Sequence, residues 1–225
     1  MDNVERIYEE CKLLVRAMDR PILRVREDGN YYECETWINE FDNLMHNGLS
    51  SLSSTLIVPN VGVRTYKNMG FLINSELSEC YHISKSDSAS SGNVNDGDFA
   101  ANKADFNSIY ELSNYITRTK DPRMNEVNIN AKIDAVVGLF INKCTISNEL
   151  LKDIYVVKKM IQYLSGIDYP IYLYDQLSGK LEYIDLTKEQ ENILISSLSG
   201  NQILCWPDSA MEAEFIPIES HSMSK

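Results

Sequence analysis

The stretch EVNINAKIDAVVGLFI, residues 126–141, contains the strongest strand signals in the chain. Two strands are predicted in it, Glu126–Ile129 and Asp134–Ile141. The second strand is apolar on both of its faces, which is typical of a strand covered on both sides. The sequence therefore predicts a sheet core with Asp134–Ile141 near its centre.

Further strand signals lie on both sides of this stretch. Those between residues 55 and 84 are joined by connections too short for crossovers, so we expect antiparallel pairing there. A hairpin is predicted after it, with a turn around Ser178–Gly179. The additional predicted strands are Ile22–Arg26, Thr55–Val58, Val61–Tyr66, Met69–Asn74, Glu79–Ser84, Pro170–Tyr174, Leu181–Ile184 and Gln202–Trp206.

Five segments carry apolar residues at helical spacing. Because helices and antiparallel strands are segregated and do not alternate regularly, the predicted class is α+β, with a mixed, largely antiparallel sheet packed by about five helices. One domain is expected over residues 1–206, with 167–206 as a candidate small subdomain. The predicted helices are residues 3–18, 33–46, 106–117, 147–165 and 187–199, the last opening with a Thr187–Gln190 capping box.

Composition excludes several classes of protein. The 225-residue chain has 21 basic and 33 acidic side chains, a net charge of −12. That balance argues against nucleic-acid binding and is compatible with a basic protein partner, from the host or from a bacterium. The longest apolar run, residues 135–141, is far shorter than the roughly 20 residues of a membrane span. The acidic, polar N-terminus does not resemble a secretory signal.

The cysteine pattern bears on metal binding and on compartment. There are five cysteines, an odd number, and no CxxC pair. A disulfide framework or a metal site is therefore not expected. Because most of the cysteines lie among apolar residues, we expect reduced thiols and a reducing, cytosol-like compartment.

Three short patches have an order that bears on catalysis. Arg24 lies on an early predicted strand, Ser53, Ser54 and Thr55 begin a later one, and Glu126 opens the strand described first. Arginine presents a fixed fork of donors to phosphate, and a carboxylate beside an anomeric carbon stabilises an oxocarbenium-like charge. This order resembles the mono-ADP-ribosyltransferase toxins and effectors.

The resemblance implies a cofactor and residue roles. NAD would be bound by Arg24 and Ser53, with Ser54 supporting the site and Glu126 stabilising the ribosyl cation. The three candidate catalytic residues are thus Arg24, Ser54 and Glu126. The position of the family's second acid, two residues before the glutamate, is occupied by Met124. Arg64, also on a predicted strand, is an alternative arginine.

Other groups are alternative candidates. Cys80 and His82, two residues apart on one predicted strand face, are candidates for a nucleophilic pair with partners elsewhere. Asp175 and Asp185 flank the predicted hairpin and are candidate acid–base carboxylates. The polar stretch 85–105 is predicted to be a disordered or a ligand-covering loop.

The C-terminal segment, residues 207–225, combines a glutamate cluster with a small, polar end. It is expected to be flexible. This pattern is similar to the C-terminal signals of bacterial type IV effectors, which implies a secreted effector acting in host cytosol. The alternative is a non-enzymatic protein-binding module, an adaptor or an inhibitor of another protein, that uses its acidic surface; outside secretion, a cytoplasmic location is expected.

Overall fold

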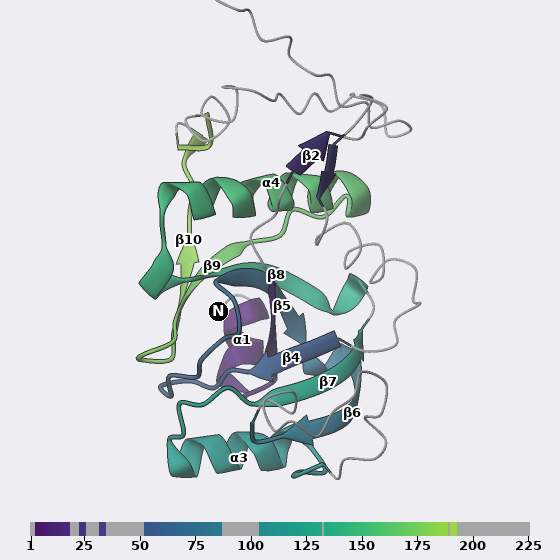
Figure 1. Ribbon diagram of the computed structural model, residues 1–225, viewed down its shortest axis with the longest axis vertical. Coiled ribbons are helices and arrows are strands. Elements are labelled where there is room, and N and C mark those ends of the chain that lie inside the picture. The colour runs from purple at the N-terminus through teal and green to yellow at the C-terminus, as the bar shows by residue number, and fades with distance from the viewer. Residues whose placement is uncertain are drawn as a thin grey trace, which may run out of the picture.

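The computed structural model describes residues 3–18, 23–25, 32–34, 52–86, 104–131, 133–188 and 190–192. Short 3-10 helices, η1 (Ser75–Leu77), η4 (Ile133–Ala135) and η5 (Lys143–Thr145), join some of the main elements. The main elements are, in chain order, α1 (Asn3–Glu9), β1 (Leu13–Met18), β2 (Leu23–Val25), β3 (Tyr32–Cys34), β4 (Leu52–Leu56), β5 (Met69–Asn74), β6 (Ser78–Ser84), α3 (Ile109–Thr119), β7 (Glu126–Ala131), β8 (Val136–Asn142), α4 (Asn148–Ser165), β9 (Ile171–Asp175) and β10 (Lys180–Ile184) (Figure 1).

Eight of the strands form one sheet in the order β10-β9-β8-β5-β1-β4-β7-β6. Every neighbouring pair is antiparallel except β8 and β9, which run parallel. Strands β2 and β3 pair separately as a short antiparallel ladder. The α+β class and the mixed, largely antiparallel sheet are therefore confirmed, with the apolar strand β8 in the interior of the sheet.

The sheet is strongly curved, as the short connections require. β5 and β6 are four positions apart in the sheet, which is about 19 Å across a flat sheet. The chain from Asn74 to Ser78 spans at most about 14 Å. The end of β5 must therefore approach the start of β6, and η1 indeed contacts η4, which joins β7 to β8.

The ladder between β1 and β4 is shorter than the ladder on the other side of β1. β1 forms six residue pairs with β5 but only two with β4. Gly70, on β5, lies opposite Ala17 of β1, and a Cβ at Gly70 would collide with the Arg16 carbonyl oxygen. A glycine at residue 70 therefore allows β5 to pack closely on β1.

Two long helices pack against the sheet. α3 packs against β6, and α4 packs across β8 and β5, on opposite sides of the view in Figure 1. Ser108 and Ser147 cap them by accepting hydrogen bonds from the backbone N–H groups of Glu111 and Leu150. These two predicted helices are confirmed.

The fourth helix seen in the described residues begins as predicted. Residues 188 and 190–192 are helical, and the Thr187–Gln190 capping box forms with both of its reciprocal hydrogen bonds. Most of the fifth predicted helix, at 33–46, lies outside the described residues, and Cys34 at its start belongs to strand β3.

The first helix is shorter than predicted. The apolar spacing over residues 3–18 predicts one continuous helix, but α1 ends at Glu9 and residues 13–18 form strand β1. Cys11 adopts a left-handed conformation with φ of 58°, and the N–H groups of Cys11 and Lys12 bond to the carbonyls of Tyr8 and Ile7. This is the Schellman pattern, which ends a helix, here without the glycine that usually announces it.

The prediction of a strand at Val61–Tyr66 is wrong. Only an isolated bridge between Val58 and Val61 occurs there. The Tyr174 hydroxyl accepts from the N–H of Val63 and donates to its carbonyl, so a side chain takes the place of a partner strand. The predicted strand Met69–Asn74 is confirmed with the same first and last residues. The predicted hairpin turn before β10 is also confirmed.

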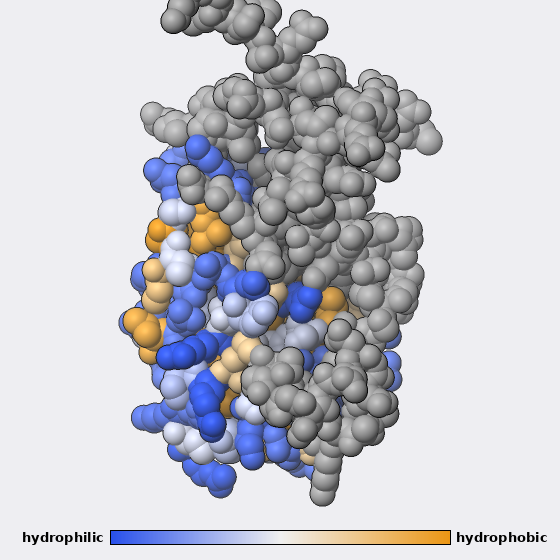
Figure 2. All heavy atoms as spheres, in the orientation of Figure 1, coloured by the Kyte–Doolittle hydropathy of each residue, from blue (hydrophilic) through white to orange (hydrophobic). Residues whose placement is uncertain are grey.

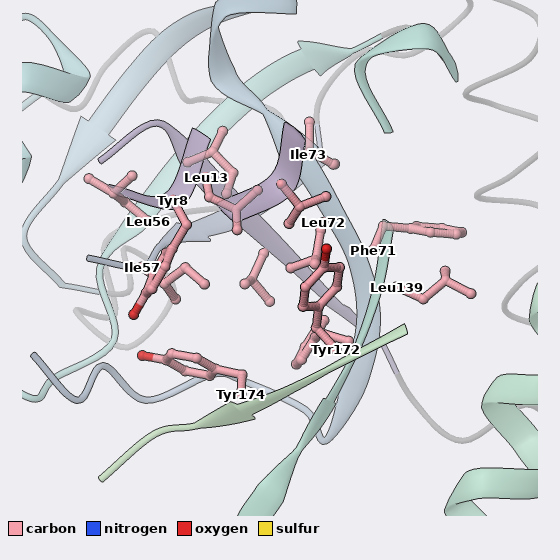
Figure 3. Packing of buried hydrophobic residues seen from close by; sticks show 14 of the residues in the cluster. Tyr8, Leu13, Leu56, Ile57, Phe71, Leu72, Ile73, Leu139, Tyr172 and Tyr174 are labelled. Atoms are coloured by element: carbon pink, nitrogen blue, oxygen red, sulfur yellow. The ribbon is translucent and has the colours of Figure 1, made fainter. Parts of the chain in front are cut away.

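The core fills the curve of the sheet, where aliphatic side chains pack around buried tyrosines (Figure 3). The hydroxyls of Tyr8, from α1, and Tyr174, from β9, point toward one another. Tyr8 donates to the carbonyls of Val58 and Gly179, and the N–H of Asn60 bonds to the same Gly179 carbonyl. The β9–β10 turn is therefore tied to both α1 and the loop after β4.

Over the described ranges, no helix combines the length and apolar character that crossing a bilayer requires. The described surface seen in Figure 2 is mostly hydrophilic, with apolar residues gathered near β10. Exposed apolar side chains in this part of the fold include Leu177 and Tyr183.

Candidate functional site

Three consecutive hydroxyl side chains on β4 donate hydrogen bonds to residues 125–127, where β7 begins. The Ser53 hydroxyl donates to Oε1 of Glu126 at 2.9 Å. The Ser54 hydroxyl donates to the Val127 carbonyl at 2.7 Å, and the Thr55 hydroxyl donates to the Asn125 carbonyl at 3.2 Å. The hydroxyl cluster of β4 therefore fixes both the backbone and the one carboxylate at the start of β7.

Glu126 is a buried carboxylate held by a hydroxyl. Its residue is 6% exposed, whereas Ser53 is exposed. A carboxylate taken out of water needs hydrogen-bond donors to remain acceptable in a folded protein, and the Ser53 hydroxyl is one of them. The buried carboxylate is therefore hydrogen-bonded to an exposed serine.

Arg16 of β1 bonds to the backbone of the same serine. Its Nη1 donates to the Ser53 carbonyl at 2.7 Å, and the side chain is half-buried. β1, β4 and β7 are neighbours in the sheet. Arg16, Ser53 and Glu126 thus come from three adjacent strands and are linked through the two hydrogen bonds of Ser53.

Asn125 holds β4 and β7 together next to this site. Its Oδ1 accepts from the Leu56 N–H at 2.8 Å, and its Nδ2 donates to the Leu56 carbonyl at 2.9 Å. The side chain is 2% exposed, so both bonds are made out of water. The amide imitates a backbone partner and extends the ladder just where Glu126 is placed.

The face of the sheet that carries Glu126 is polar across three strands. On β7, Glu126 and Asn128 are two residues apart and share a face. Asn128 lies opposite Ser53 of β4 and His82 of β6, and Glu126 lies opposite Ser84 of β6. We call these five residues the polar face. All of its members except Ser53 are less than 9% exposed.

The sequence-predicted site residues divide into two groups. The structure brings Ser53 and Glu126 together, and it directs the Ser54 hydroxyl to a backbone carbonyl. The Arg24 backbone lies on β2 opposite Glu33, and its side chain is outside the described part of the chain. Arg64 is exposed, and its backbone N–H bonds to the Pro122 carbonyl.

The sequence does not indicate Arg16 as a site residue, because the apolar spacing predicts a helix that includes residues 13–18. A helix over these residues leaves Arg16 as an ordinary exposed cation, whereas a strand brings it to the backbone carbonyl of Ser53. The signal that could have found it is the run Leu13–Leu14–Val15, which is continuous apolar sequence and is fully buried in β1.

The cysteine–histidine alternative is not supported by the geometry. A β-bulge at residue 81 puts Cys80 opposite Ile129 and His82 opposite Asn128, so the two side chains point to opposite faces and the predicted shared face is wrong. Burial also raises the pKa of the Cys80 thiol to about 11, which disfavours the thiolate that nucleophilic attack requires.

Of the two carboxylates that flank the hairpin, Asp175 has a structural role. Asp175 accepts hydrogen bonds from the Ser178 hydroxyl and the Leu177 N–H, which lower the pKa of this carboxyl group. These are the bonds of a turn-forming aspartate. Among the residues that the structure describes, no group of three His, Cys, Asp or Glu side chains is arranged to hold a metal ion.

No protein-family model matches the sequence, and no curated protein sequence matches it significantly.

Proposed function

We propose that the protein is an NAD-dependent mono-ADP-ribosyltransferase whose site contains Arg16, Ser53 and Glu126. The observation that supports it is the hydrogen-bonded sequence from the Arg16 guanidinium through Ser53 to the Glu126 carboxylate. The order of residue types along the chain, arginine, then serine, then glutamate, is that of the resemblance described above. Arg16 takes the role that the sequence suggests for Arg24.

Each of the three groups has a distinct role in this reaction. The Arg16 guanidinium binds the diphosphate or a ribose hydroxyl of NAD, since its planar fork suits phosphate oxygens. The Glu126 carboxylate stabilises the positive charge that develops on the nicotinamide ribose. The Ser53 hydroxyl keeps that carboxylate oriented through the hydrogen bond it donates.

The reaction is a displacement at the anomeric carbon of the nicotinamide ribose. The bond from that carbon to the nicotinamide nitrogen breaks, and nicotinamide leaves with the electron pair. A nucleophile of the target protein attacks the resulting ribosyl cation and loses a proton. Water in place of the target nucleophile gives free ADP-ribose, so nicotinamide release is measurable without knowing the target.

The cellular role rests on the sequence. Residues 207–225, which carry the similarity to type IV secretion signals, lie outside the described residues. We place the enzyme as a secreted effector whose acceptor is a host protein. With a net charge of −12, the effector is suited to a basic partner.

The test is transfer of label from adenylate-labelled NAD to proteins of a host-cell lysate, using the full-length chain. Glu126→Gln keeps the size of the side chain and removes its charge. Glu79→Gln makes the same chemical change at an exposed position of β6 and is the matched control. We expect transfer by the wild type and by Glu79→Gln, and at least a hundredfold less by Glu126→Gln.

Two results would overturn the proposal. One is the absence of both labelled protein and released nicotinamide with folded wild-type protein. The other is nicotinamide release that is undiminished in Glu126→Gln. The first result leaves the non-enzymatic binding module as the better account, and a pull-down from the same lysate would then identify its partner. The second result removes Glu126 from the catalytic role.

A further inference from the structure

His82 and Ser84 form a buried polar pair that the proposed reaction does not yet use. The His82 Nε2 and the Ser84 Oγ lie 2.9 Å apart, within hydrogen-bond distance. The two residues are 4% and 8% exposed. An imidazole buried beside a hydroxyl in a sheet otherwise rich in aliphatic residues is costly unless its hydrogen bonds are made, so its presence calls for a reason.

The register of the sheet places this pair beside Glu126. Ser84 of β6 lies directly opposite Glu126 of β7 on the polar face, and His82 lies opposite Asn128. Cβ atoms of directly opposite residues are about 4.5–5.5 Å apart, so the Ser84 and Glu126 side chains are neighbours on this face, while the hydrogen-bond partner of the Ser84 Oγ in the structure is His82. Ser53 approaches the same carboxylate from β4, on the other side of β7.

We propose that Ser84 and His82 are positioning residues for the Glu126 carboxylate. When the N–H at Nε2 of His82 donates to the Ser84 oxygen, the hydroxyl hydrogen of Ser84 is directed away from the imidazole and toward Glu126. The carboxylate is then held from both neighbouring strands, by Ser53 on β4 and by Ser84 on β6. His82 acts through Ser84, and neither touches the reacting atoms in this scheme.

This inference rests on the proposed function, and its test uses nicotinamide release from NAD by the full-length chain. Ser84→Ala removes the hydroxyl, and Ser84→Thr keeps it on a side chain suited to a strand. Ser78→Ala is the matched control, because the Ser78 hydroxyl lies on the same strand but donates to the Asn74 carbonyl. We expect Ser84→Ala to lower kcat about tenfold with KM for NAD within about twofold, and Ser84→Thr to restore most of kcat.

The histidine is tested in the same assay. His82→Gln offers an amide N–H in place of the Nε2 donor, and His82→Leu offers none. We expect His82→Leu to match the loss of kcat in Ser84→Ala, and His82→Gln to recover at least a third of it. The double variant Ser84→Ala/His82→Leu is expected to be no slower than Ser84→Ala alone, since both changes act on one contact.

The outcomes separate the two proposals. If the wild type releases nicotinamide and Glu126→Gln does not, the proposed function stands. Full kcat in Ser84→Ala and His82→Leu would then overturn the positioning role. Equal losses in Ser84→Ala and Ser84→Thr, accompanied by a lowered Tm in both, would also contradict it, because they would show that only packing matters there. A folded wild type that releases no nicotinamide would contradict the proposed function.

Discussion

At the scale of single residues, the two neighbouring serines of β4 illustrate how one position decides a role. Ser53 and Ser54 are chemically identical and adjacent, and the sequence alone favours Ser54 as a catalytic residue. In the structure the Ser53 hydroxyl bonds to a carboxylate, whereas the Ser54 hydroxyl bonds to the backbone carbonyl of Val127. The first is a contact with the carboxylate proposed to be catalytic, and the second is a contact that holds two strands together.

Alanine variants distinguish these two roles. Ser53→Ala removes a hydrogen bond to a charged group, worth about 1.5–3 kcal/mol, so we expect kcat for nicotinamide release to fall about ten- to hundredfold with little change in Tm. Ser54→Ala removes a buried hydrogen bond to the Val127 carbonyl, so we expect a loss of about 0.5–1.5 kcal/mol in the free energy of unfolding. Steady-state kinetics and guanidinium unfolding of both variants measure the contrast. The reverse pattern would show that the site is misassigned.

The difference between the serines could not be predicted from sequence. Alternation along a strand tells which residues share a face, but it does not tell which hydroxyl meets Glu126 from another strand. That depends on the register between β4 and β7, in which Ser53 lies opposite Asn128. Register is set by long-range packing. The sequence predicts Glu126 as a site residue at the start of a strand. It does not predict that Glu126 is buried and hydrogen-bonded to Ser53.

At the scale of elements, the strands near residues 69–84 and 126–141 were predicted well because their signals are local. Met69–Asn74 is apolar up to Ile73, and the polar Asn74 caps the short 3-10 helix Ser75–Leu77 that turns the chain. The prediction of one helix over residues 3–18 is wrong because the apolar residues of α1 and of β1 together match helical spacing. The Schellman turn at Cys11 that separates them carries no glycine, and a left-handed cysteine is rare enough that no sequence rule anticipates it.

The junction of β4 and β7 depends on one amide. Asn125→Ala removes both side-chain hydrogen bonds to Leu56 and leaves its buried N–H and carbonyl unsatisfied. We expect the free energy of unfolding to fall by about 2–4 kcal/mol, measured by guanidinium unfolding. Asn114→Ala, at an exposed position of α3, is the control and is expected to stay within about 0.5 kcal/mol of the wild type. Equal stability of the two variants would mean that the Asn125 clamp is not formed.

At the scale of the whole molecule, the fold closes through contacts between distant parts of the chain. The β9–β10 turn is bonded to Tyr8 and Asn60, and the Tyr174 hydroxyl bonds to both backbone groups of Val63. The class and the mixed sheet could be predicted from the segregation of helical and strand patterns. The strand order could not, because β1 pairs with β4 and β5 from far along the chain and the sheet must curve to accept η1 and η4.

Buried tyrosines make the stability of this fold sensitive to alkaline pH. Burial is the main cause that raises the pKa of Tyr8 and of Tyr174 above the ordinary value near 10. The stability they contribute is full below about pH 10, and it is lost above that because the unfolded chain releases phenolic protons that the folded chain keeps. Each such tyrosine lowers the free energy of unfolding by up to about 1.4 kcal/mol per pH unit.

The measurement is guanidinium unfolding at about pH 8, 10 and 11, repeated for two variants. Tyr174→Phe removes one titrating group, so we expect a shallower loss of stability above about pH 10 than in the wild type. Tyr183→Phe changes a tyrosine that is 55% exposed and should leave the wild-type slope unchanged. The same slope in all three proteins would contradict the burial of the Tyr174 hydroxyl.

Arg16, Ser53 and Glu126 are proposed to form one NAD site, with Arg16 as the arginine that anchors the cofactor. Calorimetric titration of NAD into Glu126→Gln tests this proposal most directly, because this variant should bind NAD without consuming it. We expect Glu126→Gln/Arg16→Lys to bind at least about tenfold more weakly, a loss of about 1.4 kcal/mol, and Glu126→Gln/Arg24→Lys to bind like Glu126→Gln. No binding by folded Glu126→Gln, or a loss that follows Arg24 instead of Arg16, would contradict the account.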